Sequence, residues 1–160
     1  MQPTMEFISK HSGRDHLEHR SRLKMRLSEL PPVTNILIVD DTVSDADILS
    51  STLRLLFGHE ISIRHVRVLR DIRKALLDQK PDVLFLDDRL GHGTSAEVSL
   101  NMIRLSGHTH RVIVMSGLLT RARQIELLKL GVADVVHKDD IDAVRLSEAI
   151  LKVLEAPPAA

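Results

Sequence analysis

The strongest constraint on how this chain can fold is the repeated placement of a polar side chain at the end of a short apolar run. Four such runs end in carboxylate, hydroxyl or ammonium groups, in this order: Asp40 and Asp41 after 36–39, Asp87 after 83–86, Ser116 after 112–115, and Lys138 after 135–137. Apolar runs without alternation are typical of strands buried on both faces, as in a parallel sheet.

Parallel strands all end at one edge of their sheet, and in open α/β sheets the ligand crevice lies outside the carboxyl ends of the strands. The sequence therefore predicts that three carboxylates, one hydroxyl and one lysine meet in a crevice. Each group has a structural alternative when taken alone: Asp41, Thr42 and Ser44 could cap a helix, and Asp87, Ser116 or Lys138 could be ordinary strand-end residues. Their joint occurrence at four strand ends favours a functional site.

Composition narrows the class of protein. The chain has 160 residues, of which 43% are hydrophobic, and this is enough for one domain with a real core. Lys plus Arg and Asp plus Glu number 22 each, so charge gives no sign of nucleic acid or an anionic membrane as a partner. Cysteine is absent, which excludes disulfides, and no apolar stretch has membrane-spanning length. A cytoplasmic protein is the default expectation.

Pro31 and Pro32 divide the chain into a leader, 1–32, and a domain, 33–160, because paired prolines stop a helix. Strand and helix patterns alternate five times in the domain, which is typical of a doubly wound α/β fold. The expected strands lie near 35–39, 61–66, 83–86, 112–115 and 134–136, and the expected helices near 44–57, 68–79, 95–106, 119–130 and 141–154.

The leader carries a short apolar stripe. Leu23, Leu27 and Leu30 follow helical spacing, so we expect a helical extension that docks on its own domain, a second subunit or a partner, with disorder as the alternative.

Residues 33–154 resemble a response-regulator receiver domain of two-component signalling. The resemblance implies a flavodoxin-like (βα)5 fold with strand order 2-1-3-4-5. It also implies that Asp87 is the phosphoacceptor, that Ser116 is the switch hydroxyl and that Lys138 pairs with the phosphoryl group. The implied Mg²⁺ ligands are Asp40, Asp41, Asp87 and the backbone carbonyl of Arg89.

Physical chemistry supports the same roles. Two carboxylates about 4 Å apart repel by roughly 4 kcal/mol at an effective dielectric near 20, so a cation must lie among them. Lys138 is one candidate for this cation, and a divalent ion is the other. Mg²⁺ binds carboxylate and phosphate oxygens and neutralises charge in phosphoryl transfer. A carboxylate such as Asp87 can act as the nucleophile. Asp88 should point to the opposite side of its strand, and we interpret it as a loop or capping residue.

The chain departs from the family pattern at three positions. Gly91 stands where the family usually has a proline, Asp139 stands where a proline usually follows the lysine, and Val135 replaces a usual aromatic residue. These departures affect loops and readout and leave all five chemical positions filled.

The leading hypothesis is a stand-alone receiver, since only 155–160 follow the last expected helix. The expected phosphoryl donor is a histidine kinase or phosphotransfer protein, and the output is contact with a downstream protein or a phosphorelay, without direct binding of nucleic acid or membrane. A homodimer could form through the N-terminal helix or the face between the fourth and fifth domain helices. The protein would catalyse only its own phosphorylation and dephosphorylation.

Two alternatives come from other classes. The first is a receiver-like interaction module that works without phosphorylation. The second is a phosphohydrolase with an aspartyl nucleophile, which needs a second Asp where this chain has Arg89.

Overall fold

The computed structural model describes residues 5–91 and 93–155. The chain forms two compact units, Met1–Pro32 and Val33–Ala160. None of the described helices is long and apolar enough to cross a membrane.

The first unit contains one helix, α1 (Met5–Ser28), which confirms the predicted N-terminal helix. The predicted leucine stripe coincides with low exposure: Leu23 is 3% exposed, and Leu27 and Leu30 are half-buried, whereas Leu17 and Met25 are exposed by more than half.

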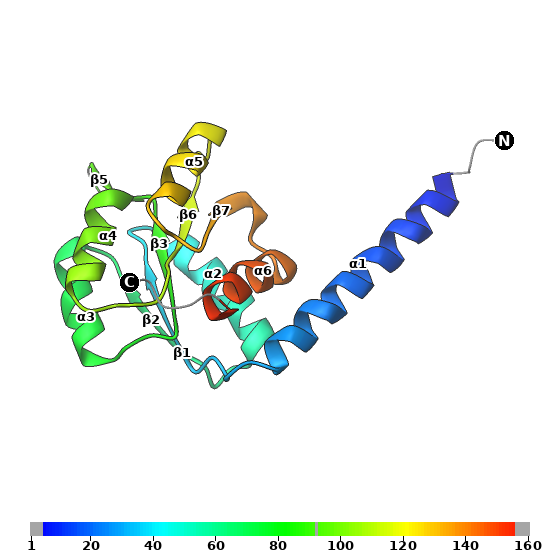
Figure 1. Ribbon diagram of the computed structural model, residues 1–160, viewed down its shortest axis with the longest axis horizontal. Coiled ribbons are helices and arrows are strands. Elements are labelled where there is room, and N and C mark those ends of the chain that lie inside the picture. The colour runs from blue at the N-terminus through cyan, green and yellow to red at the C-terminus, as the bar shows by residue number, and fades with distance from the viewer. Residues whose placement is uncertain (1–4, 92, 156–160) are drawn as a thin grey trace. The chain divides into compact units, whose positions relative to one another are not determined.

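The second unit is built on a five-stranded parallel sheet (Figure 1). Its strands are β1 (Asn35–Val39), β2 (Ser62–Val66), β3 (Val83–Asp87), β6 (Ile113–Ser116) and β7 (Asp134–His137). They lie in the order β2-β1-β3-β6-β7, which is the predicted order 2-1-3-4-5. Every residue of β1 and β3 is buried, as their unbroken apolar runs predicted. The edge strand β2 is buried only at Val66.

Helices cover both faces of the sheet (Figure 1). They are α2 (Val43–Phe57), α3 (Ile72–Asp78), α4 (Ala96–Leu105), α5 (Arg121–Lys129) and α6 (Ala143–Glu155). Alternate strand residues such as Leu37, Leu84 and Val114 form one core with residues of α3, α4 and α5. Because side chains alternate along a strand, Ile38 and Phe85 point to the other face, where α2 and α6 pack.

Two segments differ from the sequence-based expectation. The helix expected over 68–79 begins as a 3₁₀ turn, Leu69–Asp71, and is α-helical only from Ile72. The segment after Asp87, for which no strand was expected, contains two short antiparallel strands, β4 (Arg89–Leu90) and β5 (Thr94–Ser95). These strands are too short for a periodic pattern to reveal them.

Candidate functional site

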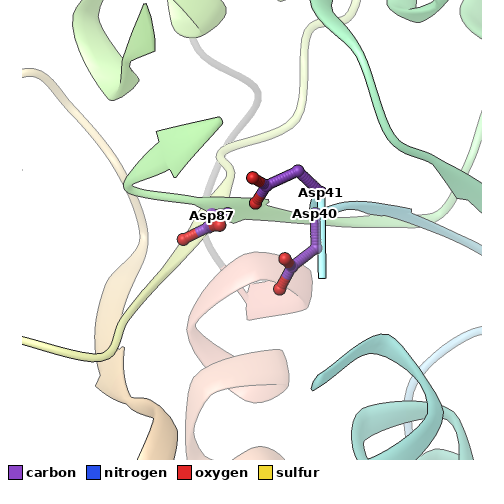
Figure 2. Close-up of side chains that lie close together, drawn as sticks. All are labelled: Asp40, Asp41 and Asp87. Carbon is purple, nitrogen blue, oxygen red and sulfur yellow. The ribbon is translucent and has the colours of Figure 1, made fainter. Parts of the chain in front are cut away.

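Three carboxylates meet at the carboxyl edge of the two central strands (Figure 2). Asp87 is the last residue of β3, while Asp40 and Asp41 directly follow β1, whose Val39 pairs with Leu86 of β3. Each of the three residues offers a carboxylate oxygen, and these oxygens all lie within 4.8 Å of one another. The parallel register therefore brings together residues that are 46 or more positions apart in the sequence.

Lys138 reaches the same cluster from β7, at the start of a 3₁₀ turn, Lys138–Asp140. Its Nζ lies 2.9 Å from Asp40 Oδ2 and 3.4 Å from Asp87 Oδ1. A further carboxylate, Asp45 in the first turn of α2, accepts from the same Nζ at 2.8 Å. Sequence reasoning missed Asp45, whose only signal was an acidic residue just inside a helix that follows a site strand.

Backbone amides orient the two carboxylates that follow β1. The Thr42 N–H donates to Asp40 Oδ1 at 2.9 Å, and the Gly91 N–H donates to Asp41 Oδ2 at 3.1 Å. Thr42 is the N-cap residue of α2, but its side chain makes no capping hydrogen bond. Because Gly91 follows β3 in the chain, its hydrogen bond holds the Asp41 carboxylate on the β3 side of the crevice.

The hydrogen bond from Gly91 explains one departure from the family pattern. Gly91 has φ +66°, which proline cannot adopt, and its N–H is the donor to Asp41, which proline lacks. Likewise, the Asp139 N–H donates to His137 Nδ1 at 3.0 Å, which a proline at 139 could not do. Both substitutions give the loops backbone donors that they use.

Burial and crowding change the protonation of the central carboxyl group. Burial and, secondly, the neighbouring Asp40 raise the pKa of Asp87 from its usual 3.8 to about 7, although Lys138 acts in the opposite direction. Burial would lower the pKa of Lys138, but the hydrogen bonds that its ammonium donates to Asp45 and Asp40 outweigh burial and raise that pKa. The crevice thus carries more negative charge than one ammonium can balance.

This donor set fits a magnesium ion. Mg²⁺ prefers hard oxygen ligands and is typically held by one or two carboxylates together with phosphate oxygens and water. Asp40, Asp41 and Asp87 supply carboxylates, and a divalent charge would relieve the repulsion that raises the pKa of Asp87.

Ser116 and Arg89 flank the acidic cluster. Ser116 is buried at the end of β6, one residue beyond Met115, which pairs with Asp87. This register places Ser116 at the same sheet edge. The Arg89 N–H faces Asp87 Oδ1 at 3.4 Å, while the Arg89 side chain is exposed.

Asp88 is a loop residue, as the sequence predicted, but its side chain has a partner that the sequence did not reveal. It lies at the bend after β3, and its carboxylate is buried and forms an ion pair with Arg123 of α5, at 2.6 Å. Arg123 also contacts Glu97 of α4 at 2.5 Å and Glu126 at 3.1 Å. We call these four residues the Arg123 cluster.

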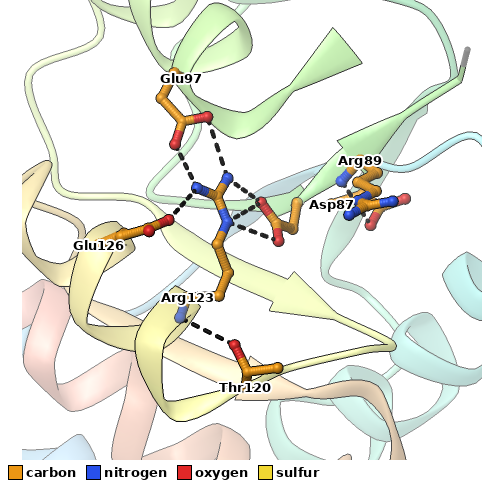
Figure 3. A network of polar contacts seen from close by, with 7 residues as sticks. Asp87, Arg89, Glu97, Thr120, Arg123 and Glu126 are labelled. Atoms are coloured by element: carbon orange, nitrogen blue, oxygen red, sulfur yellow. Dashed lines mark hydrogen bonds and ion pairs between the residues drawn. The ribbon is translucent and has the colours of Figure 1, made fainter. Parts of the chain in front are cut away.

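The Arg123 cluster joins the end of β3 to the first turns of two helices. Thr120 caps α5 by accepting from the Arg123 N–H at 3.1 Å (Figure 3). The Arg123 hydrogen bond holds the pKa of Glu97 down to about 2, and Asp88 and Glu97 raise the pKa of Arg123. No spacing rule links residues 88, 97 and 123, so only the fold could reveal the cluster.

A groove lies on the face formed by α5, β7 and the start of α6. It has a volume of about 510 Å³, and its lining includes Leu119, Arg121, Val135 and Arg145. Val135 itself is only 1% exposed.

The parallel sheet and its acidic strand edge define a receiver of two-component signalling. Residues 36–151 match the family described as response regulator receiver domain, and the chain belongs to that family. Receivers of this family are generally phosphorylated on Asp, bind Mg²⁺ at an acidic pocket, and interact with histidine kinases or phosphotransfer proteins and with downstream targets.

Solved receiver structures are similar in fold. The signal receiver domain of a putative Luxo repressor protein from Vibrio parahaemolyticus is 24% identical, with a TM-score of 0.64, over 77% of this chain and 91% of that chain. The response regulator domain of Thermotoga maritima CheB is 23% identical, with a TM-score of 0.65, over 79% and 99%.

A response regulator protein from Burkholderia pseudomallei, solved with a phosphorylated aspartic acid, calcium ion and citrate, is 20% identical with a TM-score of 0.58, over 76% of this chain and 66% of that chain. At these identities the likeness concerns the fold alone. Comparison with curated proteins gives no match.

Proposed function

We propose that this protein is a phosphorylation-controlled signalling receiver that accepts a phosphoryl group on Asp87 in a Mg²⁺-dependent reaction. The observation that carries the proposal is the convergence of Asp40, Asp41 and Asp87 within 4.8 Å, with Lys138 Nζ 3.4 Å from Asp87. A related receiver fold has been solved with a phosphorylated aspartic acid and a calcium ion.

In this proposal each side chain has a distinct task. An Asp87 carboxylate oxygen attacks the phosphorus of a donor, the bond from phosphorus to the donor breaks, and an acyl phosphate forms on Asp87. Asp40, Asp41 and the Asp87 carboxylate hold Mg²⁺, with the Arg89 carbonyl as a further ligand. When bound, the ion neutralises charge on the phosphoryl oxygens. Lys138 pairs with the phosphoryl group, and Ser116 donates to one of its oxygens.

The output would be a change in protein contact. A phosphoryl group adds charge and acceptor oxygens, and Ser116 can respond by drawing the loop that leads to α5. The donor would be a histidine kinase or phosphotransfer protein, and the protein would act in the cytoplasm. The groove beside α5 and the α1 helix are the candidate surfaces for a downstream protein or a second subunit.

Other functions fit the site less well. An aspartyl phosphohydrolase needs an acid at position 89, where Arg89 instead places an exposed guanidinium. A module that works without phosphorylation is supported by the three departures from the family pattern, Gly91, Val135 and Asp139. Two of them, Gly91 and Asp139, use their N–H groups as hydrogen-bond donors in the loops around the carboxylates.

The test is mass spectrometry of the intact protein after incubation with Mg²⁺ and acetyl phosphate or a kinase donor. We expect the mass of one phosphoryl group on the parent and none on Asp87→Asn or in the presence of a chelator. Asp47→Asn, an exposed change of the same charge, is the matched control. Labelling of Asp87→Asn at the parent level would refute the proposal.

A further inference from the structure

Lys138 is shared among carboxylates on three elements, and the closest of them has no part in the roles described above. The Nζ to oxygen distances are 2.8 Å to Asp45 of α2, 2.9 Å to Asp40 after β1 and 3.4 Å to Asp87 of β3. The phosphoacceptor therefore has the longest of the three contacts with this ammonium.

A lysine ammonium has three N–H donors and no acceptor. Two of the three meet Asp45 and Asp40 within ordinary hydrogen-bond distance, and the 3.4 Å contact with Asp87 is at best weak. A phosphoryl oxygen on Asp87 can accept a hydrogen bond from Lys138 only if one of the N–H groups of Nζ points toward that oxygen. Asp45 is thus a competitor for the same cation.

Position also distinguishes Asp45 from Asp40. Asp40 Oδ1 accepts from the Thr42 N–H, so Asp40 has a second partner that fixes it within the site. Asp45 approaches from the first turn of a helix, its side chain is 33% exposed, and Lys138 is 13% exposed. Water can solvate Asp45 if Lys138 leaves it, which makes this the easiest of the contacts to give up.

We propose that Asp45 is a positioning residue that holds the Lys138 ammonium away from Asp87 and so weakens the binding of a phosphoryl group there. This inference rests on the proposed function of Asp87. Through the Asp45 carboxylate, α2 would influence the balance between phosphorylated and unphosphorylated protein.

The test compares Asp45→Asn and Asp45→Ala with Asp47→Asn and Asp47→Ala, which change an exposed carboxylate on the same helix. The probe is beryllofluoride with Mg²⁺, titrated by fluorine NMR, because this anion on a carboxylate imitates a phosphoryl group. We expect the Asp45 variants to bind it about three- to fivefold more tightly than the parent, the scale of a partly exposed ion pair. Alanine should have the larger effect, because asparagine keeps an acceptor.

A crystal structure of Asp45→Ala without the probe supplies a second readout. We expect Lys138 Nζ to close on Asp87 from 3.4 Å to ordinary hydrogen-bond distance, below about 3.0 Å. Equal or weaker probe binding in the Asp45 variants, relative to the Asp47 controls, would overturn the inference, because a merely supporting Asp45 would lose Lys138 from the site.

The two proposals fail in different ways. If the parent protein binds no beryllofluoride, the proposed function of Asp87 fails, and the position of Nζ in the variant decides the role of Asp45. If the parent binds it and the Asp45 variants match their controls, only the role of Asp45 fails. Thermal unfolding of each variant shows whether it is folded before either comparison is made.

Discussion

Replacing Arg123 by alanine removes the only partner that the structure gives, within the described residues, to the buried Asp88 side chain. That side chain is 7% exposed, and Arg123 approaches it at 2.6 Å through Nη2 and at 3.2 Å through Nε. Breaking a buried ion pair by removing one partner costs about 3–5 kcal/mol. Arg123 is itself 22% exposed, so water can reach part of the gap, and we expect Arg123→Ala to lower the free energy of unfolding by about 2–3 kcal/mol.

The assay is urea unfolding followed by far-ultraviolet circular dichroism, because the chain has no Trp or Tyr for fluorescence. Arg121→Ala, an exposed change in the same turn of α5, should stay within about 0.5 kcal/mol of the parent. In a protein that already carries Asp88→Asn, the loss of unfolding free energy caused by Arg123→Ala should be smaller by at least about 1 kcal/mol, since the buried charge is already gone. An unfolding midpoint of Arg123→Ala equal to that of Arg121→Ala would refute the reasoning.

Three further outcomes are expected. Asp87 has a raised pKa, so its ionisation opposes folding increasingly as pH rises from 3.8 to about 7. Without Mg²⁺, Asp87→Asn should therefore be more stable than the parent by up to about 4 kcal/mol at pH 8 and by little near pH 4. A difference in urea unfolding that does not change with pH would contradict this. Arg89→Ala should change the half-life of the phosphorylated protein severalfold without blocking labelling, because in receivers the residue two past the acceptor borders the path of the hydrolytic water; an unchanged half-life by timed mass spectrometry would remove the argument. Deleting 1–32 should leave a folded unit that still accepts the phosphoryl group but has a changed association state or partner affinity. Sedimentation and partner binding identical to those of the full chain would point to a leader without a docking role.

The sheet and its acidic edge could be predicted from the sequence because both follow from local rules. Unbroken apolar runs such as 36–39 and 83–86 predict buried parallel strands, and parallel strands must end at one edge. The residue after each run then falls at that edge, whatever its distance along the chain. Asp40, Asp87 and Lys138 could be placed together on this basis before any coordinates were known.

The partners supplied by helices could not be predicted in this way. Asp45 and Glu97 lie in the first turn of a helix, where an acidic residue is ordinary. Arg123 also lies in a first turn, and nothing in the sequence around it indicates a buried partner. Whether such a side chain reaches a strand end depends on how its helix is rotated on the sheet. That rotation is decided by core packing of residues such as Leu100 and Leu127 and leaves no periodic signal in the charges.

The end of β3 has two carboxylates that face different cations on opposite sides of the sheet. Asp87 faces Lys138 and the acidic pair, whereas Asp88 faces Arg123, Glu97 and the helices of the other layer. Because side chains alternate along the chain, this separation keeps the guanidinium from neutralising Asp87. Only Lys138 is left as a side-chain cation for Asp87, within the described residues that contact it, and Lys138 is already shared with Asp45 and Asp40. The negative charge that remains around the buried Asp87 is the physical reason why we propose that this site depends on Mg²⁺. On the Asp88 side, Glu97 and Glu126 are 42% and 63% exposed, so water can solvate them, and we expect Arg123 to matter there for stability.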